Sequence, residues 1–119
     1  VAKILDDVKG RMLEDIVLLE TFKSAYHNQE VFKFKFDNGG EYDMVIYDNR
    51  QNTCSLYEVK HSTEVTERQM RYLKDAKRCK TIETKFGTIT GKYVLYRGES
   101  KTIDDVEYLN VEQFLCGLK

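Results

Sequence analysis

The sequence predicts an α+β (or α/β) domain in which helices flank a mixed β-sheet, in the order αβββαββα. Two observations carry most of this prediction: the first quarter of the chain has apolar residues at helical spacing, and residues 31 to 61 contain three strand-like runs separated by polar turns. A second helical segment, two short apolar runs and a short final helix complete the order. The 119 residues, of which 41% are hydrophobic, suit a single domain with one packed core.

Residues 3 to 26 predict one long helix, because apolar residues recur there at three- and four-residue steps over a wide face. These residues are Ile4, Leu5, Val8, Met12, Leu13, Ile16, Val17, Leu19 and Phe22. Glu14 lies at the edge of this face, so it is either a solvated surface acid or a functional carboxylate. Gly10 is a weak helix former inside the pattern, which indicates close packing or the approach of a ligand.

Residues 31 to 37 predict the first strand, since apolar and charged side chains alternate strictly along them. Three phenylalanines would face one side of the sheet and two lysines the other. The residues concerned are Phe32, Phe34 and Phe36 on one face, with Lys33 and Lys35 on the opposite face.

A tight hairpin turn at Asn38-Gly39 leads into a second strand, which carries Asp43. The following Gly40 leaves the length of this loop open by one residue. That one residue decides whether Asp43 shares a face with Phe34 or with Lys35, because a slip of one position turns every side chain of a strand over.

The run from residue 55 to residue 61 predicts the third strand of an antiparallel meander. Glu58 and Lys60 are two residues apart, so they share one face of this strand. If residues 49 to 52 form the preceding loop, Asp43 lies opposite Glu58. Two adjacent carboxylates repel each other, so this pairing indicates that a cation lies between them.

Residues 66 to 80 predict a second helix, whose start is marked by a capping-box pattern at Thr66 and Gln69. Basic residues dominate this segment, and three of them recur at steps of three and four: Arg71, Lys74 and Arg78. Such a face is either a solvated surface or a stripe that contacts phosphates.

The last third of the chain is less regular. Residues 81 to 90 are polar and ambiguous, whereas residues 92 to 96 and 106 to 109 predict short strands. Asn110 predicts the N-cap of a final short helix over residues 111 to 118, with Phe114 and Leu115 facing inward.

Composition excludes several classes of function. A net charge of −1 excludes a generally basic nucleic-acid coat, although a local basic patch is compatible with it. The three cysteines are widely spaced and only two histidines occur, which indicates reduced, mostly buried thiols and disfavours a zinc site. No apolar run reaches membrane-spanning length and no signal-peptide pattern begins the chain, so we expect a cytoplasmic protein.

Asp43, Glu58 and Lys60 form the strongest chemical pattern in the sequence. Paired carboxylates offer the hard oxygen ligands that Mg²⁺ or Mn²⁺ prefers. Such an ion activates water and stabilises charge on a phosphate, and a nearby lysine orients that water or neutralises the phosphoryl oxygens. This is the chemistry of phosphodiester cleavage. The alternative is that Glu58 and Lys60 form a simple ion pair at the surface.

The order of these features resembles the PD-(D/E)xK nuclease-like superfamily, which implies a restriction-endonuclease-like fold. More narrowly, the chain resembles the C-terminal nuclease-like domain, of unassigned role, of prokaryotic ATP-binding proteins in which an AAA+-type ATPase module comes first. The motifs that carry the likeness are Gly10-x-x-Leu13-Glu14-x-x-Val17, Gly40-Glu41-Tyr42-Asp43-Met44-Val45-Ile46, Glu58-Val59-Lys60, Tyr93-Val94-Leu95-Tyr96-Arg97-Gly98 and Leu109-Asn110-Val111-Glu112-Gln113-Phe114-Leu115.

The resemblance assigns a role to each matching position. Asp43 and Glu58 would bind Mg²⁺ or Mn²⁺ together with the backbone carbonyl of Val59, Glu14 would complete the metal shell, and Lys60 would be the catalytic lysine.

The likeness also implies a nucleic-acid partner. DNA is the expected substrate, contacted through Arg71, Lys74, Arg78 and Gln69, the last standing where some members of the superfamily carry a substrate-contacting glutamine. Tyr42 replaces the proline of the superfamily's name.

Walker motifs are absent from these 119 residues, so we expect an excised domain whose ATP-binding module lies upstream in the same chain. The alternative function is a catalytically inactive interaction or regulatory module of the same ATPase.

Overall fold

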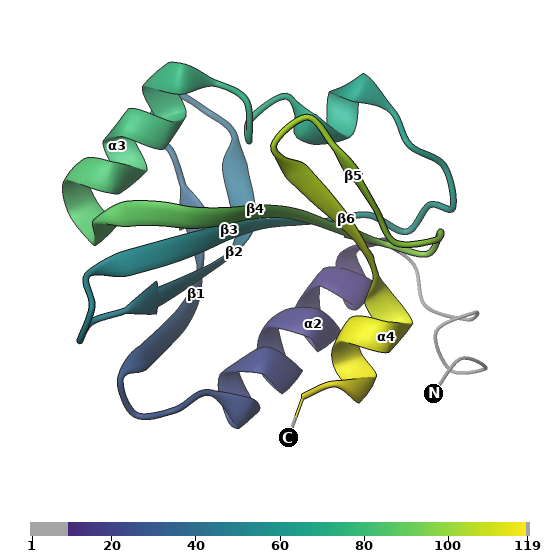
Figure 1. Cartoon of the computed structure of the whole chain (residues 1–119), viewed down its shortest axis with the longest axis horizontal. Coiled ribbons are helices and arrows are strands. Elements are labelled where there is room, and N and C mark those ends of the chain that lie inside the picture. The colour runs from purple at the N-terminus through teal and green to yellow at the C-terminus, as the bar shows by residue number, and fades with distance from the viewer. Residues whose placement is uncertain (1–9, 119) are drawn as a thin grey trace.

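The protein is a six-stranded mixed sheet with helices on both faces, as the computed structural model of residues 10–118 shows (Figure 1). The strands are β1 (Gln29–Lys35), β2 (Glu41–Asp48), β3 (Thr53–Val59), β4 (Thr88–Tyr96), β5 (Lys101–Ile103) and β6 (Val106–Asn110). The helices are α2 (Gly10–Ser24), the 3-10 helix η1 (Glu67–Met70), α3 (Ala76–Phe86) and α4 (Val111–Cys116). The predicted fold class is confirmed, and the short strand β5, which follows β4 and precedes β6 along the chain, is additional.

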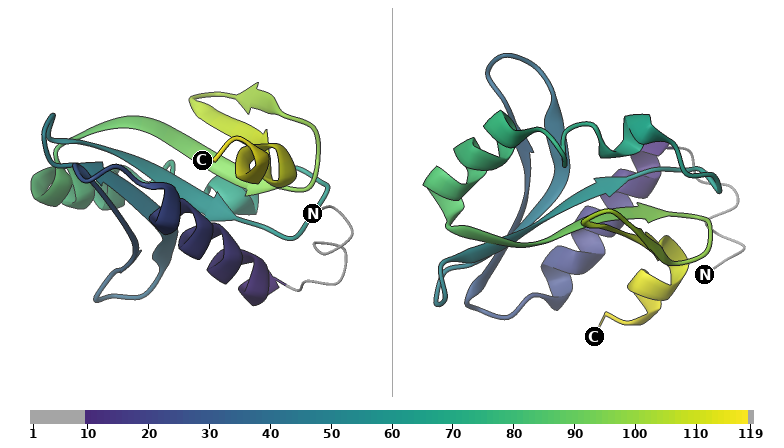
Figure 2. Two further views of the ribbon diagram at one scale, coloured as in Figure 1. Left: turned by 90° about the horizontal axis from the view of Figure 1, so that it is seen from below. Right: turned by 45° about the horizontal axis from the view of Figure 1, so that its top comes forward.

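The strands lie in the order β1-β2-β3-β4-β6-β5. The first three form the predicted antiparallel meander, whereas β4 runs parallel to both β3 and β6, and β5 is antiparallel to β6. Helices α2 and α4 lie on one face of this sheet and α3 with η1 on the other (Figures 1 and 2). None of the helices in residues 10–118 is long and apolar enough to cross a membrane.

Two hydrophobic clusters fill the space between the sheet and its helices. The cluster under α3 and η1 includes Leu56, Leu73 and Ile82, all fully buried. The cluster under α2 and α4 includes Leu13 and Val17. The predicted faces of the first strand are confirmed, because all three of its phenylalanines pack against the α3-side cluster. The inward positions predicted for the final helix are also confirmed on the α2 side.

Helix α2 buries a narrower face than the sequence predicts. Its buried residues are Leu13, Val17 and Thr21, which recur every four residues. By contrast, the predicted core residues Met12, Leu19 and Phe22 are exposed, at 58%, 56% and 62% respectively. The sheet can contact only one side of the helix, so these three residues lie on its outer surface.

Two other expectations concern the start of this helix. Among residues 10–118, a Cβ atom added at Gly10 would meet nothing within 4 Å, so close packing against this part of the chain is wrong, and approach of a ligand stays a prediction. The beginning of the predicted helix at residues 3 to 9, with Ile4, Leu5 and Val8, lies outside the described residues.

The single helix predicted over residues 66 to 80 is wrong. The chain forms the one-turn helix η1, a turn over residues 71 to 74, and then α3. Asp75 starts α3 anew, since its side chain accepts hydrogen bonds from the backbone N–H groups of Lys77 and Arg78. The ambiguous residues 81 to 90 hold the end of this helix and the beginning of β4.

The final helix begins where its capping pattern predicts. The side chain of Asn110 accepts a hydrogen bond of 3.0 Å from the backbone N–H of Gln113. The three cysteines are free; Cys54 and Cys79 are buried and Cys116 is exposed, in agreement with the prediction of reduced, mostly buried thiols.

Candidate metal centre

A β-bulge in β2 places Asp43 and Met44 on the same face of the sheet. The β1–β2 pairing shifts register there, so that Asp43 and Met44 together oppose the single residue Lys33. Bulges of this kind turn a side chain away from the simple alternation of a strand. Tyr42 and Val45, on either side of the bulge, both pack into the α3-side cluster. Asp43 and Met44, which lie between them, both face the α2 side of the sheet.

The turn before β2 sets the register that decides which face of the sheet holds Asp43. Gly39 and Gly40 both have positive φ angles, of 94° and 89°, which glycine adopts at little cost. Beyond the turn, Lys35 pairs with Glu41. Of the two faces that the sequence left open, Asp43 therefore lies on the one that holds the lysines of β1.

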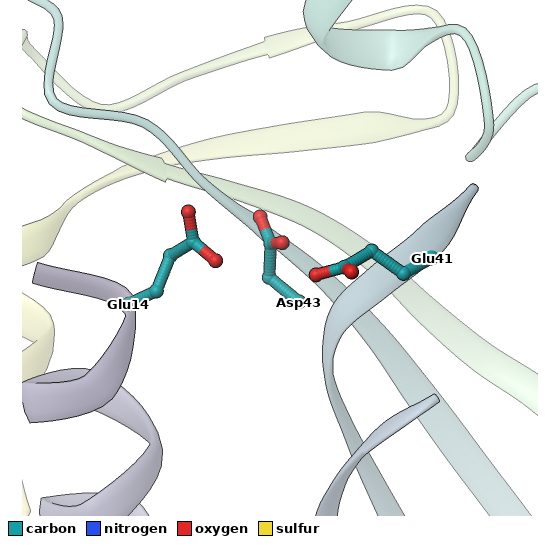
Figure 3. A group of neighbouring side chains, drawn as sticks. All are labelled: Glu14, Glu41 and Asp43. Carbon is teal, nitrogen blue, oxygen red and sulfur yellow. The ribbon is translucent and has the colours of Figure 1, made fainter. Parts of the chain in front are cut away.

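Three carboxylates converge at this point, and we call Glu14, Glu41 and Asp43 the acidic cluster. One carboxylate oxygen from each lies within 4.8 Å of the others. Figure 3 shows Glu14 reaching from α2 toward Asp43, with Glu41 entering from the other side along β2. The cluster thus contains residues of both α2 and β2, and its three carboxylates are close enough to bind one small ligand.

The strands β2 and β3 separate beside the cluster. Their paired register ends at Met44 and Tyr57, although β3 continues to Val59. Beyond that point, carboxylates take the place of the backbone ladder. The N–H of Val59 donates to Asp43 Oδ2 at 2.8 Å, and the N–H of Asp43 donates to Glu58 Oε1 at 3.3 Å. The predicted proximity of Asp43 and Glu58 is therefore confirmed.

The loop before β3 has the predicted length, since Asp48 pairs with Thr53. Lys60 Nζ lies 3.8 Å from Glu58 Oε2, so these two side chains lie on the same side of the chain, as their spacing predicts. The predicted residues nevertheless form two neighbouring groups. Asp43 belongs with Glu14 in the acidic cluster, whereas Glu58 and Lys60 form a pair that contacts Asp43 through its backbone.

Burial raises the pKa values of Asp43 and Glu58 above those of ordinary carboxyl groups. Asp43 is 6% exposed and Glu58 is 5% exposed. Desolvation raises the pKa of Asp43 to about 7, although the hydrogen bond from Val59 acts in the opposite direction. Desolvation, followed by the charge of Asp43, raises the pKa of Glu58 to about 8. Carboxylates buried in this way are stabilised as anions when a cation binds between them.

Glu41 is the member of the cluster to which the sequence prediction gave no role. The available signal was its spacing of two from Asp43, which places both residues on one strand face by the argument used for Glu58 and Lys60. Lys33 was also missed as a neighbour of the site. Its Nζ lies 3.6 Å from Glu14 Oε1 and 3.5 Å from Glu41 Oε2.

The three residues of the predicted basic stripe do not lie on one helix. Arg71 and Lys74 lie in the turn before α3, and only Arg78 belongs to that helix. Lys74 Nζ is 2.6 Å from Asp104 Oδ2. The guanidinium of Arg78 lies over two aromatic rings and donates to the carbonyl of Gly39 at 2.9 Å. The prediction that the three bases share one helix is therefore wrong, whereas contact of these residues with phosphate stays a prediction.

Gln69 is likewise used inside the protein. Its Oε1 accepts hydrogen bonds from the backbone N–H of Thr66 at 2.9 Å and from the hydroxyl of Tyr108 at 3.0 Å. Its Nε2 donates to the carbonyl of Glu64 at 2.9 Å. The side chain is buried, so the predicted capping role is confirmed and the structure does not present Gln69 as a nucleic-acid contact.

One protein family matches almost all of this structure. The family described as Domain of unknown function (DUF4143) matches residues 9–114, a range that contains every carboxylate discussed above. No match was found among curated proteins or among solved structures.

Proposed function

The chain belongs to the family described as Domain of unknown function (DUF4143), and we propose that it is a divalent-metal-dependent nuclease-like domain that binds or hydrolyses nucleic-acid phosphodiesters. The observation that carries this proposal is the convergence of Glu14, Glu41 and Asp43 where β2 and β3 separate. Together with the Glu58–Lys60 pair, these residues supply oxygen ligands and a cation at one end of the sheet.

The residues of the acidic cluster fit Mg²⁺ or Mn²⁺. All three donors are carboxylates, which are hard ligands, and Asp43 is buried, which favours a bound cation over an isolated charge. Glu14, Glu41 and Asp43 would hold the ion, with Glu58 beside them. A bound ion would supply Lewis acidity and a more acidic water.

The protein's own groups have distinct tasks in this proposal. The N–H of Val59 fixes the carboxylate of Asp43 in place through its bond of 2.8 Å. Glu58 can hold or release a proton near neutral pH, because burial raises its pKa to about 8. Lys60 is 39% exposed in its side chain, so its ammonium can meet an incoming phosphate without leaving Glu58.

The resemblance described above extends the proposal beyond this domain. We infer that the domain works with an ATP-binding module of the AAA+ type in the same chain, in the cytoplasm, and that DNA is its substrate.

A second candidate function is a catalytically inactive interaction or regulatory module. The observation that favours it is the outer surface of α2, where Met12, Leu19, Phe22 and the nearby Tyr26 are more than half exposed. Exposed apolar side chains grouped on one surface are typical of protein–protein contacts. The net charge of −1, the packing of Arg78 within the fold and the surface ion pair of Lys74 with Asp104 point the same way.

Metal binding and cleavage measured together distinguish the two functions. We expect the domain to bind Mn²⁺ in calorimetry and to cleave a labelled DNA substrate, with Asp43→Asn losing both activities. Lys60→Ala should lose cleavage while it still binds Mn²⁺. DNA binding should weaken steeply as salt is raised. A domain that binds neither Mn²⁺ nor DNA would refute the nuclease proposal and favour the interaction module.

A further inference from the structure

Lys33 places a positive charge inside the acidic cluster. Its Nζ lies 3.6 Å from Glu14 Oε1 and 3.5 Å from Glu41 Oε2, so the same ammonium contacts an acid of α2 and an acid of β2. The side chain is only 22% exposed. Its position follows from the bulge, because Lys33 is the residue of β1 that opposes both Asp43 and Met44.

The electrostatics of the cluster require such a charge. Carboxylate oxygens within 4.8 Å of one another repel, and a single ammonium between two of them offsets part of that repulsion. A divalent ion would bind the same oxygens, at a distance of about 2.1 Å in the case of Mg²⁺. The bound ion would then repel the nearby ammonium of Lys33, because both are positively charged.

We propose that Lys33 is the resident counter-ion of the acidic cluster and that a divalent cation must displace it from Glu14 and Glu41 in order to bind. This inference rests on the proposed metal site, and it means that the ammonium of Lys33 competes with the metal ion for Glu14 and Glu41. Lys60 differs from Lys33, because it pairs with Glu58 outside the cluster and can keep that contact when metal binds. Metal binding would therefore release one lysine of the site and retain the other.

A titration of the protein with Mn²⁺, followed by calorimetry, tests this competition. Lys33→Met should bind Mn²⁺ at least about fivefold more tightly than the wild type, since it removes two partly exposed ion pairs and one such pair changes an equilibrium by up to roughly that factor. Lys33→Arg, which keeps the charge, should bind as weakly as the wild type. The matched control is Lys35→Met, which removes the same charge two residues away on β1 and should have a much smaller effect.

Each outcome of the titration has a distinct meaning. Mn²⁺ binding by Lys33→Met that is equal to or weaker than that of the wild type would overturn the counter-ion role and leave the metal site standing. Loss of binding in Asp43→Asn identifies the titrated site as the acidic cluster. If neither the wild type nor Lys33→Met binds Mn²⁺, the proposed function and the inference both fail.

A second measurement needs no substitution and therefore does not depend on the folding of a variant. Acetylation of the wild-type protein, followed by peptide mass spectrometry, reports how accessible each lysine amine is. Addition of Mn²⁺ should raise the rate at Lys33 several-fold and leave the rate at Lys35 unchanged. An unchanged or slower rate of acetylation at Lys33 while Mn²⁺ is bound would refute displacement. That result is expected if Lys33 serves only to link β1 to α2 through its ion pair with Glu14.

Discussion

Replacing Asp43 with asparagine should stabilise the metal-free protein at pH 8, although it removes the central ligand of the proposed site. Asp43 is 6% exposed, and desolvation raises its pKa from 3.8 to about 7. A rise of that size corresponds to about 4 kcal/mol of unfavourable ionisation at 1.36 kcal/mol per pKa unit. Asparagine keeps an oxygen that can accept from Val59 but carries no charge, so we expect a net gain of about 2 kcal/mol after the weaker hydrogen bond is subtracted.

The direction of the pH dependence follows from the same shift. Between about pH 4 and pH 7, the carboxyl of Asp43 keeps its proton in the folded protein and has lost it in the unfolded chain. Folding then takes up a proton, so the stability of the metal-free wild type should fall as the pH rises through this window. Asp43→Asn lacks this dependence and should resemble the wild type near pH 4.

Urea unfolding in the presence of a chelator, at several values between pH 4 and pH 8, measures this effect. Asp37→Asn is the matched control, because the same chemical change at an exposed position should alter stability by less than about 0.5 kcal/mol. Addition of Mn²⁺ at pH 8 should reverse the order, stabilising the wild type but not Asp43→Asn. Asp43→Asn less stable than the wild type by the same amount at pH 4 and pH 8 would refute the electrostatic reasoning.

Three further outcomes test other parts of the structure. Stabilisation of the wild type by Mn²⁺, measured as a shift in melting temperature, should be greater at pH 8 than at pH 5.5. The reason is that protons compete with the ion for Asp43 and Glu58, whose pKa values are raised; an equal shift at both pH values would place the ion elsewhere. Gln69→Ala should lower the free energy of unfolding by about 2 kcal/mol, since it leaves the buried hydroxyl of Tyr108 without that acceptor, and should leave DNA affinity unchanged. Gly87→Ala should destabilise the domain by more than about 2 kcal/mol in chemical denaturation, because its Cβ would lie 1.9 Å from the carbonyl oxygen of Asn52 at a φ of 81°; a smaller loss would mean that the loop yields.

The sequence predicted the parts of the site that depend on strand alternation and loop length. The spacing of Glu58 and Lys60 and the four-residue loop before β3 were sufficient to bring Asp43 beside Glu58. Strand alternation and loop length do not depend on contacts from distant parts of the chain. Strand alternation also places Glu41 on the face of Asp43, which would have completed the acidic cluster.

The bulge at Asp43 could not be predicted in this way. Strict alternation counted back from Val45 would place Asp43 on the α3 side, whereas the extra residue in β2 puts Asp43 and Met44 both on the α2 side. The bulge is a feature of the pairing between β1 and β2, which the residues around Asp43 do not specify by themselves. The position of Lys33 opposite Asp43 depends on that pairing as well.

The errors in the helices have a different origin. Apolar residues at helical spacing cover more than one side of α2, and the sequence alone does not say which side the sheet will cover. The break in the second helix was in principle detectable, since Asp75 is a good N-cap residue in the middle of the predicted segment. Because α3 begins there, Arg71 and Lys74 lie in the preceding turn and do not share the helix of Arg78.

The most direct test of the proposed metal centre is a crystal structure of the protein grown with Mn²⁺, with anomalous diffraction data collected to locate the ion. We predict an anomalous peak within coordination distance of Asp43 and of at least one of Glu14 and Glu41, with the ammonium of Lys33 moved away from both glutamates. A protein saturated with Mn²⁺ that shows no peak at this position, and in which Lys33 still lies between Glu14 and Glu41, would contradict this prediction.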